Sequence, residues 1–417
     1  MGMKVKRVVT VLAVAALAGA VLATAASGAP RKDPGITSTS ILIGGTFPLT
    51  GPASLYKTIP FAEKAYFDYV NDHGGVNGRK ITMEILDDAY DPSKTVPLTQ
   101  QLVEQDKVFA DFGSLGTADN LAIWSYLNVK HVPQVGIATG DSYWGFSYKK
   151  YPWTVAFQPD YPGEAKIYGK YILANMPSAK IGVLYQNDAY GKNYYAGLRV
   201  GLGAKSKSMI VSAQSYDVTQ TSLTQQILAL KSAGADTFVV FATPSPTITA
   251  LVTATKVGWS PATFINNVSA NRLFLLAAAA NGAAVDGVIS TSYLNSSTLP
   301  ALAKSPGVAL GNDILAKYAP SLVSSFQKGD GNVMYGLAQG WTFVYALQHA
   351  GKNPTRASLV KAYKSLNTSK NPFVYPGIKL QTSATDNFPI EQEILIKWAG
   401  GGSGDWVPFG KLYSGVR

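Results

Sequence analysis

Two short runs rich in glycine and hydroxyl side chains are the residues of this chain best suited to bind a ligand. They are Ser114-Leu-Gly-Thr117 and Ala138-Thr139-Gly140, and each follows an apolar segment. If each run begins a helix, its first backbone N–H groups lack intrahelical partners and carry partial positive charge. Phosphates and carboxylates both bind at such helix ends. N-capping by the hydroxyls is the alternative for each residue singly, but two such turns together favour a site.

Residues with catalytic or metal-binding spacing are scarce. His73, His131 and His349 are far apart, and the chain has no cysteine, which excludes disulfides, thiol nucleophiles and thiolate metal ligands. Asp87 and Asp88 are adjacent on a predicted strand and therefore point to opposite faces. The chain also lacks the nucleophile elbow of hydrolases and the phosphate loop of nucleotide hydrolases. We expect neither an enzyme nor a bound metal or cofactor.

The apolar periodicity predicts strands that alternate with helices. The expected strands are 41–47, 80–86, 108–112, 132–137, 180–185, 209–213 and 236–242, and the expected helices are 61–72, 97–105, 119–127, 163–173, 194–202 and 223–230. This order is typical of an α/β fold with parallel sheets covered by helices on both faces. Such sheets bind ligands beyond the carboxyl ends of their strands, where both glycine- and hydroxyl-rich runs are expected.

The pattern falls into two blocks, as expected for a chain of 417 residues that exceeds one hydrophobic core. The blocks meet near 158–163, where two prolines interrupt the periodicity, and the same Leu-Thr-Gln-Gln motif at 98–101 and 223–226 precedes a strand in each. Residues 301–366 are mainly helical, and a strand pair at 391–398 and 406–409 flanks a glycine-rich turn. Two related lobes could present equivalent strand-end turns to each other across a cleft.

The first residues have the features of a secretory signal peptide. Lys4, Lys6 and Arg7 precede an apolar run to residue 26, and small residues that suit cleavage after Ala25 or Ala29 follow. A retained membrane anchor is the alternative. The chain's formal charge is +11, and without these three basic residues it is near +8. The other basic residues are scattered, so we expect no nucleic-acid binding and a location outside the cytoplasm, without a lipid-anchor cysteine.

Several ordered motifs carry a family resemblance. They are Thr46–Tyr56, Asn71–Lys80, Asp87–Pro92 and, in the second block, Asn187–Gly191. They resemble the type I periplasmic binding proteins, in the leucine/isoleucine/valine-binding branch that delivers amino acids and related carboxylates to ABC importers. The resemblance runs from about 41 to 268 and more loosely to the end. It implies two Rossmann-like lobes with parallel sheets, joined by three hinge crossovers, that close on a ligand.

The resemblance also implies domain boundaries and partners. We expect a signal peptide at 1–29, a first lobe of 36–158 plus 293–384, and a second lobe of 159–292 plus 385–417. The expected function is an extracytoplasmic substrate-binding protein, a monomer that captures a small carboxylate-bearing solute and docks on ABC permease membrane subunits. That solute would be an amino acid or an aromatic or aliphatic carboxylate. A sensor of the same fold that binds an amide or urea-like solute is the alternative.

The predicted ligand-binding set combines the two runs with positions that the resemblance supplies. In the family, the residue matching Ser114 holds the ligand α-carboxylate together with the turn matching Ala138 and Thr139. Aromatic residues cover the ligand from the two sides, and a further position contacts it from the second lobe. The full set is Tyr56, Ser114, Thr117, Ala138, Thr139, Tyr190, Thr243 and Asn267.

One departure from the family concerns the ligand's amino group. Amino-acid binders place an acid just after the strand matching 263–265, and this chain has Asn266–Asn271 there, with no acid. A buried ammonium without a countercharge is costly. Either Asp141 or another acid substitutes, or the ligand lacks an amino group, which adds amides and urea-like solutes to the candidates. Asn267 could also simply cap the next helix. We therefore expect amino acids to bind no better than their des-amino analogues.

Overall fold

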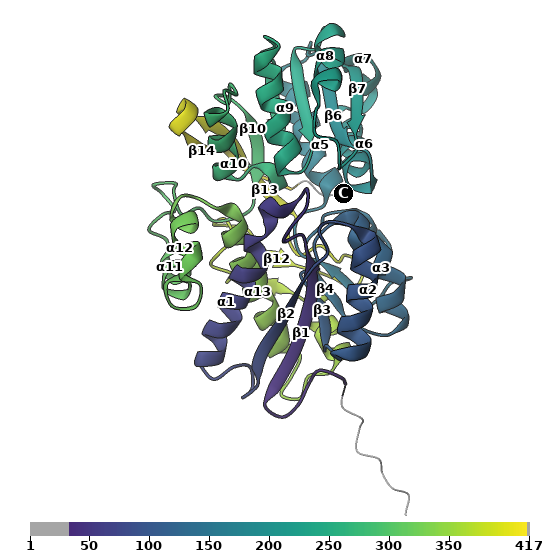
Figure 1. Ribbon diagram of the computed structural model, residues 1–417, viewed down its shortest axis with the longest axis vertical. Coiled ribbons are helices and arrows are strands. Elements are labelled where there is room, and N and C mark those ends of the chain that lie inside the picture. Colours follow the sequence, from purple (N-terminus) through teal and green to yellow (C-terminus); the bar gives the residue numbers. More distant parts are fainter. Residues whose placement is uncertain (1–32, 415–417) are drawn as a thin grey trace, which may run out of the picture. The chain divides into compact units, whose positions relative to one another are not determined.

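The first of the two large sheets has five parallel strands in the order β2-β1-β3-β4-β5 (Figure 1). The computed structural model describes residues 33–414. Helices α1 (Thr58–Asp72) and α13 (Gly331–His349) lie on one side of this sheet, and α2 (Pro92–Gln100) and α3 (Thr117–Val129) lie on the other. The strands are β1 (Ser40–Phe47), β2 (Lys80–Asp87), β3 (Ala110–Phe112), β4 (Gln134–Ile137) and β5 (Thr154–Ala156).

The second sheet has seven strands in the order β14-β13-β10-β9-β8-β6-β7. Five are parallel, namely β6 (Ile181–Gln186), β7 (Ile210–Tyr216), β8 (Thr237–Phe241), β9 (Ala262–Ile265) and β10 (Ile289–Ser292). The last two, β13 (Gln392–Ala399) and β14 (Asp405–Ser414), run antiparallel, so this sheet is mixed where parallel sheets were expected. The reason is the short glycine-rich turn between them, since a connection that short joins only antiparallel neighbours.

Helix α5 (Tyr161–Asn175) leads from the first sheet into the second. The helices that connect strands of the second sheet are α6 (Ala189–Leu202), α7 (Ser206–Met209), α8 (Thr224–Ser232), α9 (Pro244–Lys256) and α10 (Arg272–Ala280). The remaining helices are α4 (Tyr143–Phe146), α11 (Pro306–Tyr318), α12 (Pro320–Gln327) and α14 (Arg356–Tyr363), and β11 (Asn367–Thr368) pairs with β12 (Leu380–Gln381). None of the helices in residues 33–414 has both the length and the apolar character needed to cross a bilayer.

The chain passes between the two sheets after β5, after β10 and before β13. The predicted α/β fold, with two Rossmann-like lobes and three crossovers, is therefore confirmed. The residue limits of each lobe stay a prediction, and the expected signal peptide lies outside the described residues.

Most expected elements are present, and the differences have local causes. The apolar periodicity placed a helix at 97–105, whereas α2 begins at Pro92. Asp91-Pro-Ser indicates an N-cap and first turn, and this is confirmed, because Asp91 accepts a hydrogen bond from the backbone N of Ser93 at 2.9 Å. Helix α9 was not expected after Thr243, because its first turn contains two prolines. Proline is tolerated there, where its missing N–H has no intrahelical partner to lose.

A carboxyl group lies in the core of the first lobe without a hydrogen-bond partner. Glu63 on α1 is fully buried, and neither of its side-chain oxygens is hydrogen-bonded within the described residues. Burial raises the pKa of Glu63 well above its ordinary value. The native state therefore retains this proton where an unfolded glutamate, with a pKa of about 4.3, loses it. The contribution of Glu63 to the free energy of unfolding therefore falls as the pH rises above the pKa of the unfolded glutamate.

We expect Glu63→Met to stabilise the protein by roughly 1–3 kcal/mol at pH 7.5, because it removes an unsatisfied buried acid. The gain should shrink toward pH 4.5. Urea unfolding at both pH values measures it, with the half-exposed Glu104→Met as control. A loss of stability at both pH values would show that Glu63 is satisfied in the folded protein.

Candidate functional site

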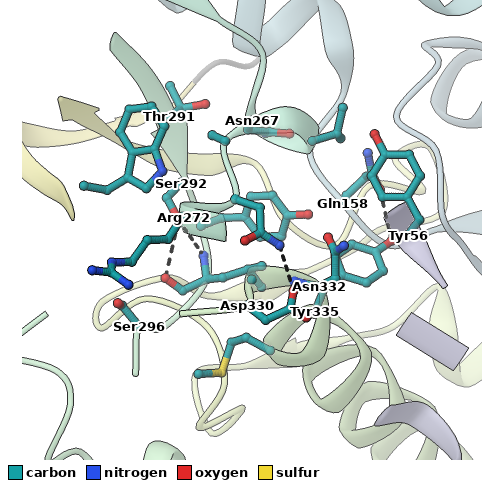
Figure 2. Close-up of a pocket in the computed structure, with 18 of the residues that line it drawn as sticks. Tyr56, Gln158, Asn267, Arg272, Thr291, Ser292, Ser296, Asp330, Asn332 and Tyr335 are labelled. Atoms are coloured by element: carbon teal, nitrogen blue, oxygen red, sulfur yellow. Dashed lines mark hydrogen bonds between the residues drawn. The ribbon is translucent and has the colours of Figure 1, made fainter. Parts of the chain in front are cut away.

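A cavity of about 140 Å³ lies where the carboxyl ends of the two sheets meet (Figure 2). The first lobe contributes Tyr56 after β1, Leu115–Thr117 after β3 and Ala138 after β4. The second lobe contributes loops after β6, β8, β9 and β10. This is the position in which open α/β sheets bind ligands.

Aromatic side chains form much of the cavity wall. They are Tyr56, Tyr90, Tyr161, Tyr190, Tyr293, Tyr335, Tyr375 and Trp406. Polar groups lie among them, including Gln158, whose Oε1 accepts a hydrogen bond from the Tyr335 hydroxyl at 3.0 Å. A largely apolar wall with a few placed polar groups is typical of small-molecule sites. An apolar cavity on the order of 150 Å³ holds a benzene ring, so the ligand is expected to be small.

Helix α3 begins at the cavity, and its N-cap residue has no side chain that could cap it. Gly116 is its N-cap residue, with φ 112°, and both Gly116 and Thr117 line the cavity. A β-carbon at Gly116 would lie 2.1 Å from Asp119 Oδ2, so only glycine fits. The Thr117 hydroxyl is 2.6 Å from that of Thr139, which accepts from the Tyr161 hydroxyl at 3.2 Å. The first N–H groups of a helix lack intrahelical partners, which suits an anionic group of a ligand.

Ser114 is not at the cavity, although the sequence predicted it as the main carboxylate contact. Its hydroxyl accepts from the backbone N of Thr46 at 3.0 Å and donates to Asp111 Oδ2 at 2.8 Å, so it links the ends of neighbouring strands. Gly113, with φ 74°, turns the chain just before it. Thr139 also lies outside the lining and contacts it only through Thr117 and Tyr161.

Two buried acids lie behind the start of α3. Thr95 Oγ1 lies 2.9 Å from Asp88 Oδ2 and 3.1 Å from Asp119 Oδ1. Burial, together with the neighbouring charge of Asp88, raises the pKa of Asp119 to about 7. An anionic ligand at the α3 N-terminus would therefore face a mostly protonated Asp119 below this pH and a carboxylate above it.

Two buried carboxyl groups also lie behind the second-lobe wall. The backbone N of Asn267 donates to Glu164 Oε1 and its Nδ2 to Glu393 Oε1, both at 2.7 Å. Thr291 donates to the same Glu393 oxygen at 2.8 Å. Burial raises the pKa of Glu393 to about 7, although the hydrogen bonds from Thr291 and from Asn267 Nδ2 act to lower it. Asn267 and Thr291 line the cavity, whereas neither glutamate does.

Polar contacts join the two lobes beside the cavity. Asn271 caps α10 with its side-chain oxygen and donates its Nδ2 to Asp330 Oδ1 at 2.7 Å, and Asp330 in turn caps α13. Arg272 donates to the carbonyl oxygen of Lys328 at 2.9 Å, and its Nε lies 3.1 Å from Asp405 Oδ2. Two helix caps from different lobes therefore bind each other.

The structure brings most of the predicted site residues to one cavity, although their contacts with a ligand stay predictions. Those lining it are Tyr56, Thr117, Ala138, Tyr190, Thr243 and Asn267. Asp141, one of the alternatives for a substitute acid, is buried, does not line the cavity and accepts from the backbone N of Tyr143 at 2.9 Å. No group of His, Asp or Glu side chains in residues 33–414 has the arrangement of a metal site.

Sequence reasoning missed cavity residues contributed by the crossovers and by the later helices. They include Gln158, Tyr161, Arg272, Tyr293, Asp330 and Tyr335. Gln158 and Tyr161 lie in the run with two prolines, which marked a boundary between blocks and gave no sign of a site. The other four follow no motif that could have singled them out.

Comparison with known proteins gives the family. The family model described as periplasmic binding protein matches residues 40–403. The Leu/Ile/Val-binding protein homolog 3 of Brucella melitensis is 26% identical over 200 residues, which cover 47% of this chain and 52% of that protein. The match thus spans about half the length of this curated relative. The chain belongs to the periplasmic binding protein family, in the type I branch that its motifs resemble.

Solved structures share the fold at low sequence identity. A branched-chain amino acid ABC transporter protein from Thermus thermophilus with bound valine is 17% identical, with a TM-score of 0.76, over 91% of this chain and 97% of that one. A solute-binding protein of an ABC transporter from Rhodopseudomonas palustris, in complex with 3,4-dihydroxybenzoic acid, is 20% identical, with a TM-score of 0.73, over 91% and 98%.

We expect Asn271→Asp to open the lobes, because it keeps the α10 cap but places a second carboxylate against Asp330. Small-angle X-ray scattering at pH 7.5 should show a larger radius of gyration than for the wild type. Asn271→Ser, which keeps a capping oxygen without the amide, is the matched control and should open less. Urea unfolding of the same proteins distinguishes opening of the lobes from loss of folded protein. Identical scattering from all three proteins would show that this contact does not hold the lobes together.

Proposed function

We propose that this protein is the extracytoplasmic substrate-binding component of an ABC importer and that it captures a small carboxylate between its lobes. The observation that carries the proposal is the uncapped N-terminus of α3 at a cavity walled by tyrosines. The relatives described above support it, since valine and 3,4-dihydroxybenzoic acid both carry a carboxylate. Closure of the lobes on the ligand would present a surface to the permease subunits.

Thr117, and not Ser114, is the residue we propose for the carboxylate. Thr117 lies in the first turn of α3 and lines the cavity, where its hydroxyl and the first helical N–H groups are available to one anion. The Ser114 hydroxyl is already engaged by Asp111 and by the backbone N of Thr46. Tyr161, through Thr139, holds the Thr117 hydroxyl in place.

The proposed ligand class is a carboxylate without an ammonium group. The acids that line the cavity are Asp330 and Asp405, and both have partners: Asp330 accepts from Asn271, and Asp405 pairs with Arg272. A cationic amine of a ligand would therefore have to compete with Asn271 for Asp330 or with Arg272 for Asp405. An aromatic or aliphatic carboxylate avoids this cost, and the tyrosine-rich wall suits its apolar part.

A thermal-shift screen tests the proposal. Aromatic acids, short-chain acids, amino acids and amides are compared, and we expect carboxylates to raise the melting temperature and to bind one to one in calorimetry. Thr117→Val should weaken the best carboxylate by roughly 10- to 100-fold, the order for losing a hydrogen bond to a charged group. Ser114→Ala should leave its affinity within about twofold. Stabilisation by amides alone, with no response to any carboxylate, would refute the proposal.

We also expect carboxylate affinity to fall as pH rises through about 7, because ionised Asp119 repels an anion at the α3 N-terminus. Calorimetry of the best carboxylate from pH 5.5 to 8.5 measures this fall. Asp119→Asn should flatten the profile, since its amide does not ionise. A profile equally steep in the variant would assign the pH dependence to another group.

A further inference from the structure

The cavity has two sides, and the start of α3 lies on one of them. Figure 2 shows Gln158 on one side of the cavity and Arg272 on the opposite side. Gln158 Nε2 lies 3.5 Å from the Tyr161 hydroxyl. That hydroxyl donates to Thr139, which is hydrogen-bonded to Thr117 in the first turn of α3. An anion bound at the start of α3 therefore leaves the side with Arg272 to the rest of the ligand.

The Arg272 guanidinium is fixed by contacts on two of its three nitrogens. Nη1 donates to the carbonyl oxygen of Lys328, which follows α12, at 2.9 Å. Nε lies 3.1 Å from Oδ2 of Asp405, the first residue of β14. Because the guanidinium is planar and rigid, these two contacts also set the direction of the third nitrogen, Nη2.

Nη2 has no partner among the described residues. The hydrogen bond and the ion pair of Arg272 use the other two nitrogens. The buried polar atoms of residues 33–414 that lack a partner do not include Nη2, and the side chain is 20% exposed, so this nitrogen keeps accessible surface. Arg272 lines the cavity, and Nη2 carries two N–H donors. A ligand acceptor bound there displaces no protein contact.

Two hydroxyls lie beside Arg272 in the cavity wall. A β-carbon at Gly329 would lie 2.8 Å from Arg272 Cδ and 3.1 Å from Thr298 Oγ1, so these two side chains are neighbours. Thr298 Oγ1 is 3.3 Å from Ser296 Oγ, and both residues line the cavity. Only one of the two hydroxyls can donate to the other, and no other described residue accepts from either, so one hydroxyl proton remains for a ligand. This side of the cavity therefore offers hydrogen-bond donors.

The acceptor that suits this side is an uncharged oxygen. Asp405 already pairs with Arg272, so the charge of the guanidinium is balanced within the protein. A second carboxylate of the ligand would add a negative charge next to Asp405, in a cavity that Asp330 also lines. A carbonyl oxygen accepts from Nη2 without adding a charge.

We propose that Arg272 Nη2 donates a hydrogen bond to a neutral oxygen, such as a carbonyl, at the end of the ligand opposite its carboxylate. The ligand class narrows to carboxylates with a distal carbonyl, that is, oxo acids and their aromatic counterparts. This inference rests on the proposed function, because it places the ligand carboxylate at the start of α3 in the same cavity. Arg272 thereby determines specificity, besides its contact with Lys328.

Shape-matched probes test the inference. Calorimetry compares 5-oxohexanoate with 5-methylhexanoate and glutarate, which place a carbonyl, a methyl group and a carboxylate at the same position. The trio of 4-oxopentanoate, 4-methylpentanoate and succinate is one carbon shorter, and 4-acetylbenzoate, 4-isopropylbenzoate and terephthalate form an aromatic trio. In at least one trio, we expect the ketone to bind roughly tenfold tighter than the alkyl acid and tighter than the dicarboxylate.

Arg272→Met tests the contact itself, because methionine keeps an unbranched stem and removes the donors. The affinity ratio of the ketone to the alkyl acid should fall about tenfold. A role confined to joining the lobes would weaken both ligands equally, so an unchanged ratio overturns the inference. Arg199→Met, at an exposed position on α6, is the control and should leave every ratio as in the wild type.

Asp405→Asn tests the charge balance at Arg272. Asparagine keeps an oxygen for the backbone N of Trp406, which Asp405 Oδ1 binds at 2.7 Å, but removes the negative charge. The dicarboxylate should gain about tenfold relative to the alkyl acid, and the ketone should stay ahead of the alkyl acid. A dicarboxylate without this gain, or a lost preference for the ketone, overturns the inference.

The outcomes separate this inference from the proposed function. If no carboxylate binds, the proposed function fails and the inference fails with it. If carboxylates bind but the members of every trio have equal affinities, only the inference fails. A dicarboxylate that binds the wild type more tightly than the ketone in every trio also overturns it.

Discussion

Buried carboxyl groups without cationic partners decide which hydrogen-bonding atoms of this protein face the cavity. Asp111 binds the Ser114 hydroxyl and Glu393 binds the Asn267 amide, and in both cases the donor is turned away from a ligand. None of these acids takes part in the ion pairs of the described residues. Hydroxyl and amide groups donate hydrogen bonds to these carboxyl groups instead, because a buried acid needs hydrogen-bond donors even where no cation is near.

The two lobes contribute different chemistry to the cavity. The first offers the start of α3, where a ligand anion can meet backbone N–H groups, and the second offers Asn267 and Thr291, which Glu393 holds from outside the lining. A ligand that satisfies both must touch both lobes, so its binding energy favours the closed arrangement. The contact between Asn271 and Asp330 favours the same arrangement without a ligand. The strength of the Asn271–Asp330 contact therefore determines how much of the ligand's binding free energy is needed to close the lobes.

Much of the fold was predictable because its signals are local. Alternating apolar periods gave most strands and helices, and Asp91 followed by a proline indicates where α2 begins. The candidate site was predictable only in part. Tyr56, Thr117 and Asn267 reach the cavity as expected, whereas the Ser114 hydroxyl does not. Its partner Asp111 is only three residues away, but the turn at Gly113 that joins them is a feature of the folded backbone.

The sequence by itself determined the family, the alternation of strands and helices, and the position of the two glycine- and hydroxyl-rich turns at strand ends. These follow from short-range patterns that any fold of the chain must respect. Only the tertiary structure decided which atoms at those turns are free. Glu393 meets Asn267 across 126 positions of sequence, and Asp330 meets Asn271 across 59. Such pairings depend on how distant strands and helices pack, and no local pattern records them.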